Sequence, residues 1–259
     1  MSLCLKEPDS FVVDALHPAA NFEERVLDVA PSMLIMHYTG MSSAEAAIAW
    51  LARDDSKVSC HYVIDEDGRV TQMVAERARA WHAGQSFWAG ETDINSVSIG
   101  IEIQNPGHED GYHDYLDKQM TAVLALSQDI VARHKIAPER VLGHSDVAPS
   151  RKIDPGEKFN WAWLHAHGVG HWVEPDPVGV LIGDISHGQI ENPIARAQSL
   201  LARYGYGIEA TGRNDKQSRP VVMAFQRHFR PQRVNGLIDS STVVTLERLV
   251  DALPEALVG

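Results

Sequence analysis

The sequence is poor in cysteine and contains no long apolar run. Cys4 and Cys60 are its two cysteines among 259 residues, which excludes a disulfide-framed secreted scaffold and a zinc site built from thiolates alone. No stretch approaches the ~18 consecutive apolar residues of a membrane span. The N-terminus also lacks the basic start and apolar run of a Sec-type signal peptide. We therefore expect either a cytoplasmic protein, or an envelope or periplasmic protein that arrives by another route or from a trimmed precursor.

Positive charge is scarce, because 23 Lys and Arg face 35 Asp and Glu and the net charge is −12. Nucleic acid is therefore disfavoured as a partner. The deficit is confined to residues 1–177, with 14 basic and 27 acidic side chains, whereas residues 178–259 carry 9 and 8. The change coincides with the proline-bearing segment Glu174–Pro177. It predicts two domains, over 1–175 and 178–259.

Short apolar runs alternate with longer amphipathic ones in the first segment, which predicts an α/β domain with a mixed central sheet flanked by helices. Strands are expected over 33–36, 61–64, 70–73, 97–103 and 141–143, and helices over 46–51 and 117–134. An Asp-Gly turn at 67–68 joins two of these strands into a hairpin. The second segment predicts a small all-α domain of three helices, over 193–204, over 215–229 and from Asp239 or Ser240 onward.

Residues able to bind a metal follow two of the predicted strands. His37 follows the run 33–36, His144 follows the run 141–143, and Asp154 comes ten residues after His144. Two imidazoles and one carboxylate form a common catalytic zinc set, which leaves the fourth ligand position for water. His37 and His144 are 107 residues apart, a spacing that chance matches easily. The alternative, which spacing alone favours, is that they are hydrogen-bonded histidines at strand ends.

Glu102 and Lys152 would complete a hydrolytic site around such a metal. In an alternating strand, Glu102 points away from the isoleucine face of residues 97–103, where a carboxylate can serve as a general base. Lys152 lies two residues before Asp154, and its ammonium can stabilise an oxyanion. The alternative reading is a solvated glutamate and a surface ion pair between Lys152 and Asp154.

Five sequence strings strengthen the metal-site interpretation. They are Met36-His37-Tyr38-Thr39, Ser59-Cys60-His61-Tyr62-Val63-Ile64, Ala80-Trp81-His82-Ala83-Gly84, Ser98-Ile99-Gly100-Ile101-Glu102, and Gly143-His144-Ser145-Asp146 continuing to Arg151-Lys152-Ile153-Asp154-Pro155-Gly156. In this order they resemble the type-2 N-acetylmuramoyl-L-alanine amidases, whose zinc fold is shared with peptidoglycan recognition proteins and T7-type phage lysozyme. The resemblance covers about residues 30–165.

The resemblance implies an enzyme that binds one Zn²⁺ per chain. His37, His144 and Asp154 would hold the metal, Glu102 would be the catalytic base, and Lys152 would stabilise the transition state. The reaction would be hydrolysis of the amide between the lactyl group of N-acetylmuramic acid and the L-alanine of the stem peptide, in cell-wall turnover or recycling. Two alternatives stay open: a non-catalytic peptidoglycan-recognition module, and a zinc endopeptidase that cuts within the stem peptide.

Five further residues are candidates for binding the substrate. His82 and Ala83 belong to the Trp-His-Ala-Gly string, and Asn95 precedes the Glu102 strand. Arg79 and Arg151 are suited to a stem-peptide carboxylate. The alternatives are a structural loop histidine, a turn-capping asparagine and solvated arginines.

Residues 178–259 resemble a type-1 peptidoglycan-binding domain of three helices. The matching positions are mostly apolar and include Ile194, Ala197, Leu201, Tyr206, Val222, Phe225 and Leu246. The expected partner is therefore peptidoglycan or a muropeptide, with no nucleic acid and no membrane span. The sequence leaves open the oligomeric state and whether the sugar must be 1,6-anhydro.

Overall fold

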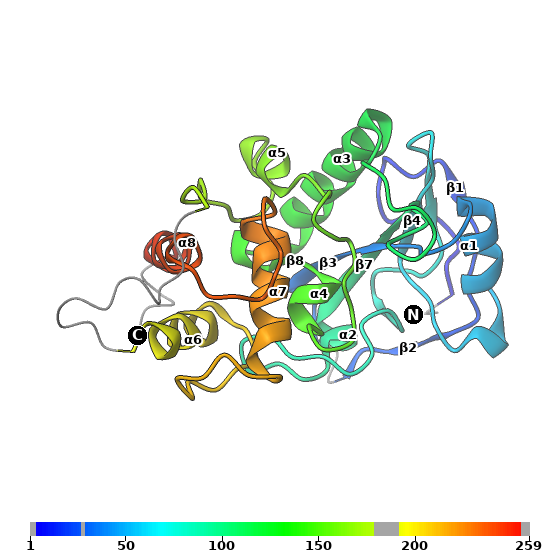
Figure 1. The fold of residues 1–259 in the computed structure, drawn as a ribbon. Coiled ribbons are helices and arrows are strands. Elements are labelled where there is room, and N and C mark those ends of the chain that lie inside the picture. Colours follow the sequence, from blue (N-terminus) through cyan, green and yellow to red (C-terminus); the bar gives the residue numbers. More distant parts are fainter. Residues whose placement is uncertain (1–3, 27–28, 179–191, 255–259) are drawn as a thin grey trace.

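A six-stranded mixed sheet forms the centre of the molecule (Figure 1). The computed structural model describes residues 4–26, 29–178 and 192–254. In spatial order the strands are β1 (Ala15–Leu16), β5 (Val70–Gln72), β4 (Tyr62–Ile64), β7 (Ser98–Ile103), β3 (Met33–Tyr38) and β8 (Val141–Gly143). β4 and β5 pair antiparallel, as the predicted hairpin requires, and the other neighbours pair parallel. β2 (Phe22–Glu24) and β6 (Ala78–Ala80) form a separate antiparallel pair.

Helices cover this sheet and form a group of their own at one end of the molecule. The helices are α1 (Ala44–Leu51), α2 (Ile94–Val97), α3 (Asp117–His134), α4 (His144–Val147), α5 (Trp161–Ala166), α6 (Pro193–Tyr204), α7 (Ser218–Phe229) and α8 (Ser240–Asp251), with 3-10 turns at Asp54–Ser56 and Pro138–Arg140. α6, α7 and α8 lie together beside β8 and α4, and α1 lies at the opposite end (Figure 1). The predicted fold class is confirmed. Within the described ranges, no helix is both long and apolar enough to span a bilayer.

The predicted element boundaries hold closely, and two differences have local causes. α3 has the predicted limits, and Ser43 caps α1 by accepting a hydrogen bond from the Ala46 amide. α7 begins at Ser218 rather than at Asp215, because the Asp215 carboxylate accepts hydrogen bonds from the amides of residues 217 and 218 and so forms a turn before the helix. β3 continues to Tyr38, so His37 lies within the strand.

The two faces of the sheet belong to different hydrophobic clusters. Ile99, Ile101 and Ile103 of β7 pack with the apolar face of α3. Met33 and Ile35 of β3 lie in the cluster that also contains the apolar side chains of α6, α7 and α8. The C-terminal helices therefore share a hydrophobic core with the sheet.

The segment predicted to link two domains is held against α8. The Asp176 amide donates a hydrogen bond to Thr245 Oγ1 at 3.0 Å, and its carbonyl accepts one from Ser241 Oγ at 2.7 Å. Its carboxylate pairs with Arg248 at 3.0 Å. The boundaries at 175 and 178 remain a prediction, but the residues around them connect the two segments by specific contacts.

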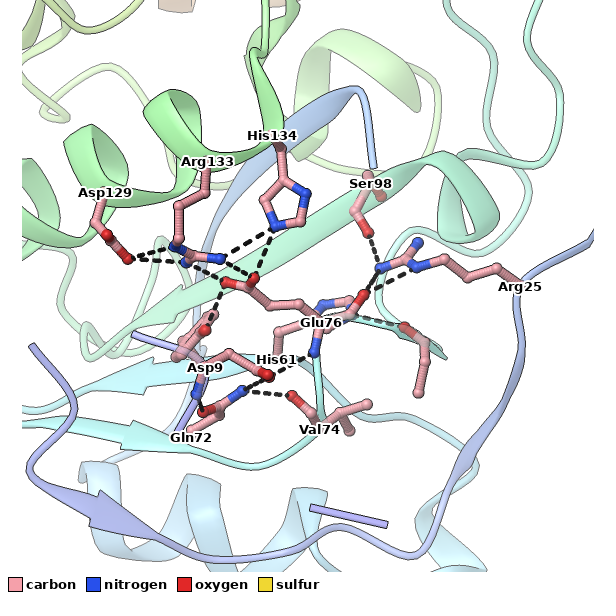
Figure 2. A network of polar contacts seen from close by, with 12 residues as sticks. Asp9, Arg25, His61, Gln72, Val74, Glu76, Ser98, Asp129, Arg133 and His134 are labelled. Carbon is pink, nitrogen blue, oxygen red and sulfur yellow. Dashed lines mark hydrogen bonds and ion pairs between the residues drawn. The ribbon is translucent and has the colours of Figure 1, made fainter. Parts of the chain in front are cut away.

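A buried glutamate in the loop between β5 and β6, Glu76, organises a polar network (Figure 2). Glu76 is 4% exposed, and its carboxylate accepts hydrogen bonds from the Tyr62 hydroxyl, the Arg133 guanidinium and His134 Nε2. Its backbone amide donates to Asp9 in the N-terminal segment. Burial alone would raise the pKa of Glu76, but Arg133 and His134 outweigh burial and lower this pKa to about 2. The ionised carboxylate of Glu76 thus joins β4 to the end of α3, and its backbone amide attaches the N-terminal segment.

We expect Glu76→Gln to destabilise the fold at neutral pH, since glutamine cannot carry the charge that Arg133 and His134 surround. The folded pKa of about 2 lies below the ordinary 4.5, and each pKa unit corresponds to ~1.36 kcal/mol, so the loss is on the order of 3 kcal/mol. This contribution is present above about pH 4.5 and is lost as the pH falls toward 2. Urea unfolding between pH 7 and pH 3 should show the difference between wild type and variant shrinking with acidity.

The matched control is Asp67→Asn, which removes an exposed ion pair with Lys118. Exposed pairs contribute little, so this variant should unfold like the wild type at every pH. A wild-type advantage over Glu76→Gln that stays constant from pH 7 to pH 3 would contradict the assigned role.

Candidate metal centre and catalytic site

Three adjacent parallel strands deliver the chemically active side chains to one edge of the sheet. β7, β3 and β8 run parallel, and the register pairs His37 with Glu102 and Met36 with Gly143. His144 directly follows Gly143 as the first residue of α4. Because the carboxyl ends of parallel strands meet at the same edge, side chains 107 residues apart become neighbours.

His37, His144 and Asp154 converge on one point. The two Nδ1 atoms are 3.0 Å apart, and each is 3.0 Å from Asp154 Oδ2. All three residues are buried, and their ligand atoms lie within 4.8 Å of one another. Two imidazole nitrogens and a carboxylate oxygen are ligands that zinc prefers. The structure therefore brings together the three residues predicted to hold the metal.

The protonation of these groups suits a cation. His144 Nε2 lies 3.0 Å from the Ala83 carbonyl, which can only accept, so Nε2 carries the hydrogen and the Nδ1 lone pair faces Asp154. Burial and the neighbouring His144 lower the pKa of His37 to about 4. Burial alone would raise the pKa of Asp154, but His144 and His37 hold it well below its usual range. A lone pair that faces an ionised carboxylate is an arrangement that a bound cation stabilises.

Glu102 and Lys152 lie beside this group, and their charged ends are not engaged by other described side chains. Glu102 Oε2 is buried and has no hydrogen-bond partner among the described residues. Burial, reinforced by Asp154, raises the pKa of Glu102 well above its usual value, and the Lys152 ammonium opposes that rise. In the described part of the chain, Lys152 Nζ forms neither a hydrogen bond nor an ion pair. The surface pair of Lys152 with Asp154, considered above as an alternative, is not formed.

Four of the five residues predicted to bind substrate meet around the loop that follows β6. The Asn95 side chain accepts hydrogen bonds from the amides of His82 and Ala83, at 3.1 and 2.8 Å. Arg151 donates to the carbonyls of Ala83 and Gln85. His82 is buried, with Nδ1 3.0 Å from His37 Nε2. His82 and Ala83 thus contact the candidate ligands His37 and His144, and Asn95 and Arg151 hold the backbone of this loop.

Arg79 lies in a different setting. Its guanidinium pairs with Glu23 at 2.8 Å and with Asp93 at 2.9 Å, and it donates to Ser96 Oγ at 3.1 Å. These contacts link β6 with β2 and with the start of α2. The structure does not bring Arg79 together with the metal ligands by any contact among the described residues, and its substrate role stays a prediction.

Asp146 is a supporting residue that the sequence reasoning missed. Its carboxylate accepts hydrogen bonds from the Gly143 amide at 2.8 Å, from His228 Nδ1 at 2.7 Å and from the Tyr206 hydroxyl at 2.6 Å. The short helix that begins at His144 is therefore attached to the C-terminal helices. Asp146 belongs to the last of the five sequence strings, but no pattern in the neighbouring sequence indicates hydrogen-bond partners 60 and 82 residues away.

Comparison with known proteins agrees with this geometry. A model of the N-acetylmuramoyl-L-alanine amidase family matches residues 27–157, and a peptidoglycan binding domain model matches residues 191–246. N-acetylmuramoyl-L-alanine amidase AmiD of Escherichia coli is 37% identical over 232 residues, which cover 85% of this chain and 82% of AmiD. This chain belongs to the N-acetylmuramoyl-L-alanine amidase family. The predicted family and enzyme class are thereby confirmed.

Other relatives support the same family. The 1,6-anhydro-N-acetylmuramyl-L-alanine amidase AmpD of Enterobacter cloacae is 31% identical and matches 61% of this amidase and 92% of its own length. AmpDh3 from Pseudomonas aeruginosa superposes with a TM-score of 0.75 at 30% identity, covering 96% of this chain and 99% of its own. AmiD in complex with anhydro-N-acetylmuramic acid-L-Ala-D-γ-Glu-L-Lys superposes with a TM-score of 0.73 at 35% identity, covering 86% and 90%.

We expect zinc to stabilise this amidase through His37, His144 and Asp154. Chelation should lower the melting temperature and added zinc should restore it, because a ligand at 100 times its Kd contributes ~2.7 kcal/mol. Asp154→Ala should melt at the same temperature with and without zinc. Calorimetry on metal-free and zinc-loaded samples measures both effects.

The matched control, His17→Ala, removes an exposed histidine that does not belong to the convergent group. It should respond to zinc like the wild type. If Asp154→Ala gained as much stability from zinc as His17→Ala does, the metal would bind elsewhere.

Proposed function

We propose that this amidase uses zinc to hydrolyse the amide between the lactyl group of N-acetylmuramic acid and the L-alanine of peptidoglycan stem peptides. The observation that carries the proposal is the convergence of His37, His144 and Asp154. Beside them lie a glutamate oxygen and a lysine ammonium that have no polar partner among the described residues. The names of the relatives support this choice of scissile bond. AmiD is an N-acetylmuramoyl-L-alanine amidase, and AmpD is a 1,6-anhydro-N-acetylmuramyl-L-alanine amidase.

His37, His144 and Asp154 fit one zinc ion per chain. When bound, zinc supplies Lewis acidity, which lowers the pKa of water and polarises an amide carbonyl. The ligands themselves are pre-arranged, since buried hydrogen bonds fix the side chains of both histidines before any metal arrives. Binding of the metal therefore requires little rearrangement of these side chains, and the associated free-energy cost is small.

Glu102 is the proposed general base. Within the described ranges its Oε2 has no competing hydrogen bond, so it can take a proton from the attacking water and return that proton to the leaving amine of L-alanine. Its raised pKa favours holding the proton between these two transfers. Glu102 pairs with His37 in the register of β7 and β3, and this supports the assignment of Glu102 as the base beside the proposed metal ligands.

Lys152 is the proposed electrostatic stabiliser. Hydrolysis of an amide develops negative charge on the carbonyl oxygen, and a fixed ammonium lowers the free energy of that transition state. Lys152 is half-buried and unpaired within the described residues, so its charge is available to the substrate. The charge of Lys152 lowers the pKa values of both His37 and Glu102, which supports its assignment to this site.

The C-terminal helices are proposed to bind peptidoglycan, as the matching domain model indicates. Because Asp146 connects them to the segment that carries His144, such binding would hold the polymer in a fixed relation to the site. Soluble anhydro-muropeptides and intact sacculi, offered separately to the full chain, test which form is cleaved. The solved complex of AmiD with its anhydro-muropeptide substrate, and that of AmpDh3 with an anhydromuramic pentapeptide, favour cleavage of the soluble form.

We expect Glu102→Gln to lower kcat about 10²–10⁴-fold without loss of zinc, since it removes the base and keeps the shape of the side chain. Mass spectrometry of wild-type digests should show an intact stem peptide that begins with L-alanine, together with peptide-free muramic acid. L-Alanine left on the muramic acid would indicate an endopeptidase, and substrate binding without any product would indicate a recognition module.

Glu45→Gln, on the exposed face of α1, is the matched control and should retain wild-type turnover. Near-normal kcat in Glu102→Gln would show that another group removes the proton.

A further inference from the structure

A chain of buried hydrogen bonds runs from a backbone carbonyl to the metal ligand His37. Ser98 Oγ lies 2.5 Å from the carbonyl oxygen of Ile94 and 3.2 Å from His82 Nε2. His82 Nδ1 lies 3.0 Å from His37 Nε2. Ser98 is fully buried and His82 is 9% exposed, so solvent does not compete for these contacts.

The backbone carbonyl at one end fixes the direction of every hydrogen bond in this chain. The Ile94 carbonyl can only accept, so the Ser98 hydroxyl donates its single proton to it. Ser98 Oγ then accepts the hydrogen of His82 Nε2, which leaves a lone pair on His82 Nδ1. That lone pair accepts the hydrogen of His37 Nε2. The remaining nitrogen of His37, Nδ1, therefore presents its lone pair to His144 and Asp154.

The His82 ring is held in this position from several sides. A Cβ on Gly100 would lie 2.6–2.8 Å from three ring atoms, so the ring occupies space that any other residue at position 100 would fill. The Asn95 side chain holds the backbone amides of His82 and Ala83. The His61 ring packs edge-on against His82 at a centroid distance of 5.7 Å.

The same loop also serves the second histidine ligand. The carbonyl of Ala83, the residue after His82, accepts the hydrogen of His144 Nε2 at 3.0 Å. Two consecutive loop residues therefore fix the orientation of both imidazoles. This arrangement accounts for the burial of His82, which a role in contacting substrate does not require.

We propose that His82 is a positioning residue, which holds His37 with Nδ1 free for the metal and thereby raises the affinity of the site for zinc. The inference rests on the proposed function, because it assumes that His37, His144 and Asp154 hold zinc. It changes the role expected for His82 from substrate contact to support of a ligand. Outer partners of this kind typically change metal affinity 10–100-fold.

The test compares two substitutions at position 82 by zinc competition against a chromophoric chelator. His82→Leu has a similar volume but cannot accept a hydrogen bond, so its zinc Kd should rise about 10–100-fold. His82→Asn carries an amide oxygen close to the place of Nδ1, so it should recover most of the lost affinity. Equal zinc affinity in His82→Leu and wild type, or equal losses in both variants, would overturn the proposal.

Ser98→Ala keeps the inference testable if the larger substitutions impair folding. It removes the acceptor that orients His82, so zinc binding should weaken in the same direction as in His82→Leu. Ser127→Ala is the matched control: Ser127 is a fully buried serine of α3 whose hydroxyl has no partner among the described residues. If Ser98→Ala binds zinc as tightly as Ser127→Ala, the chain does not orient the ligand.

Asp154→Ala in the same assay separates this inference from the proposed function. Zinc binding that survives in Asp154→Ala would show that the metal site itself is misassigned. Zinc binding that depends on Asp154 but is unchanged in His82→Leu would overturn only the role of His82.

Discussion

The meeting of two imidazole nitrogens and one carboxylate oxygen at 3.0 Å is the constraint on which the rest of the site depends. Three acceptors at such distances are unfavourable unless a cation or a proton lies among them. The fold holds them there through two neighbouring strands. His37 lies in the buried strand β3, His144 begins the helix that follows β8, and Asp154 lies in the loop after that helix. The packing of the surrounding sheet and helices stabilises the fold and offsets this unfavourable local electrostatic energy.

The C-terminal helices take part in this packing. Trp161 stacks on His228 with a centroid distance of 3.8 Å, and His228 donates to Asp146, two residues after the ligand His144. The apolar faces of α6, α7 and α8 belong to the same hydrophobic cluster as Met33 and Ile35, which lie in the strand that carries His37. We therefore expect substitutions in these helices to affect the position of His144.

Local patterns were sufficient to predict elements whose own sequence determines them. The limits of α3, the Asp-Gly hairpin and the isoleucine alternation of β7 follow from periodicity and turn chemistry. The convergence of His37, His144 and Asp154 was also predicted, but their spacing alone left it open, and the resemblance to the amidases is what supported it. The two-residue strand β1 was too short to show a period. The contacts of Ser98, Gly100 and Asp146 depend on residues distant in sequence, and no local pattern reveals which side of His82 faces the ligand.

Two buried glutamates show how the surroundings divide structural from chemical roles. Glu76 accepts hydrogen bonds from Tyr62, Arg133 and His134, and its pKa falls to about 2. Every oxygen is satisfied, so the carboxylate remains ionised and can only hold elements together. Glu102 has an oxygen without a hydrogen-bond partner among the described residues, and its pKa is raised because burial and Asp154 disfavour its charge. Such a carboxylate contributes little to holding the fold together, and its open oxygen is what the proposed role requires, namely to accept a proton and return it during hydrolysis.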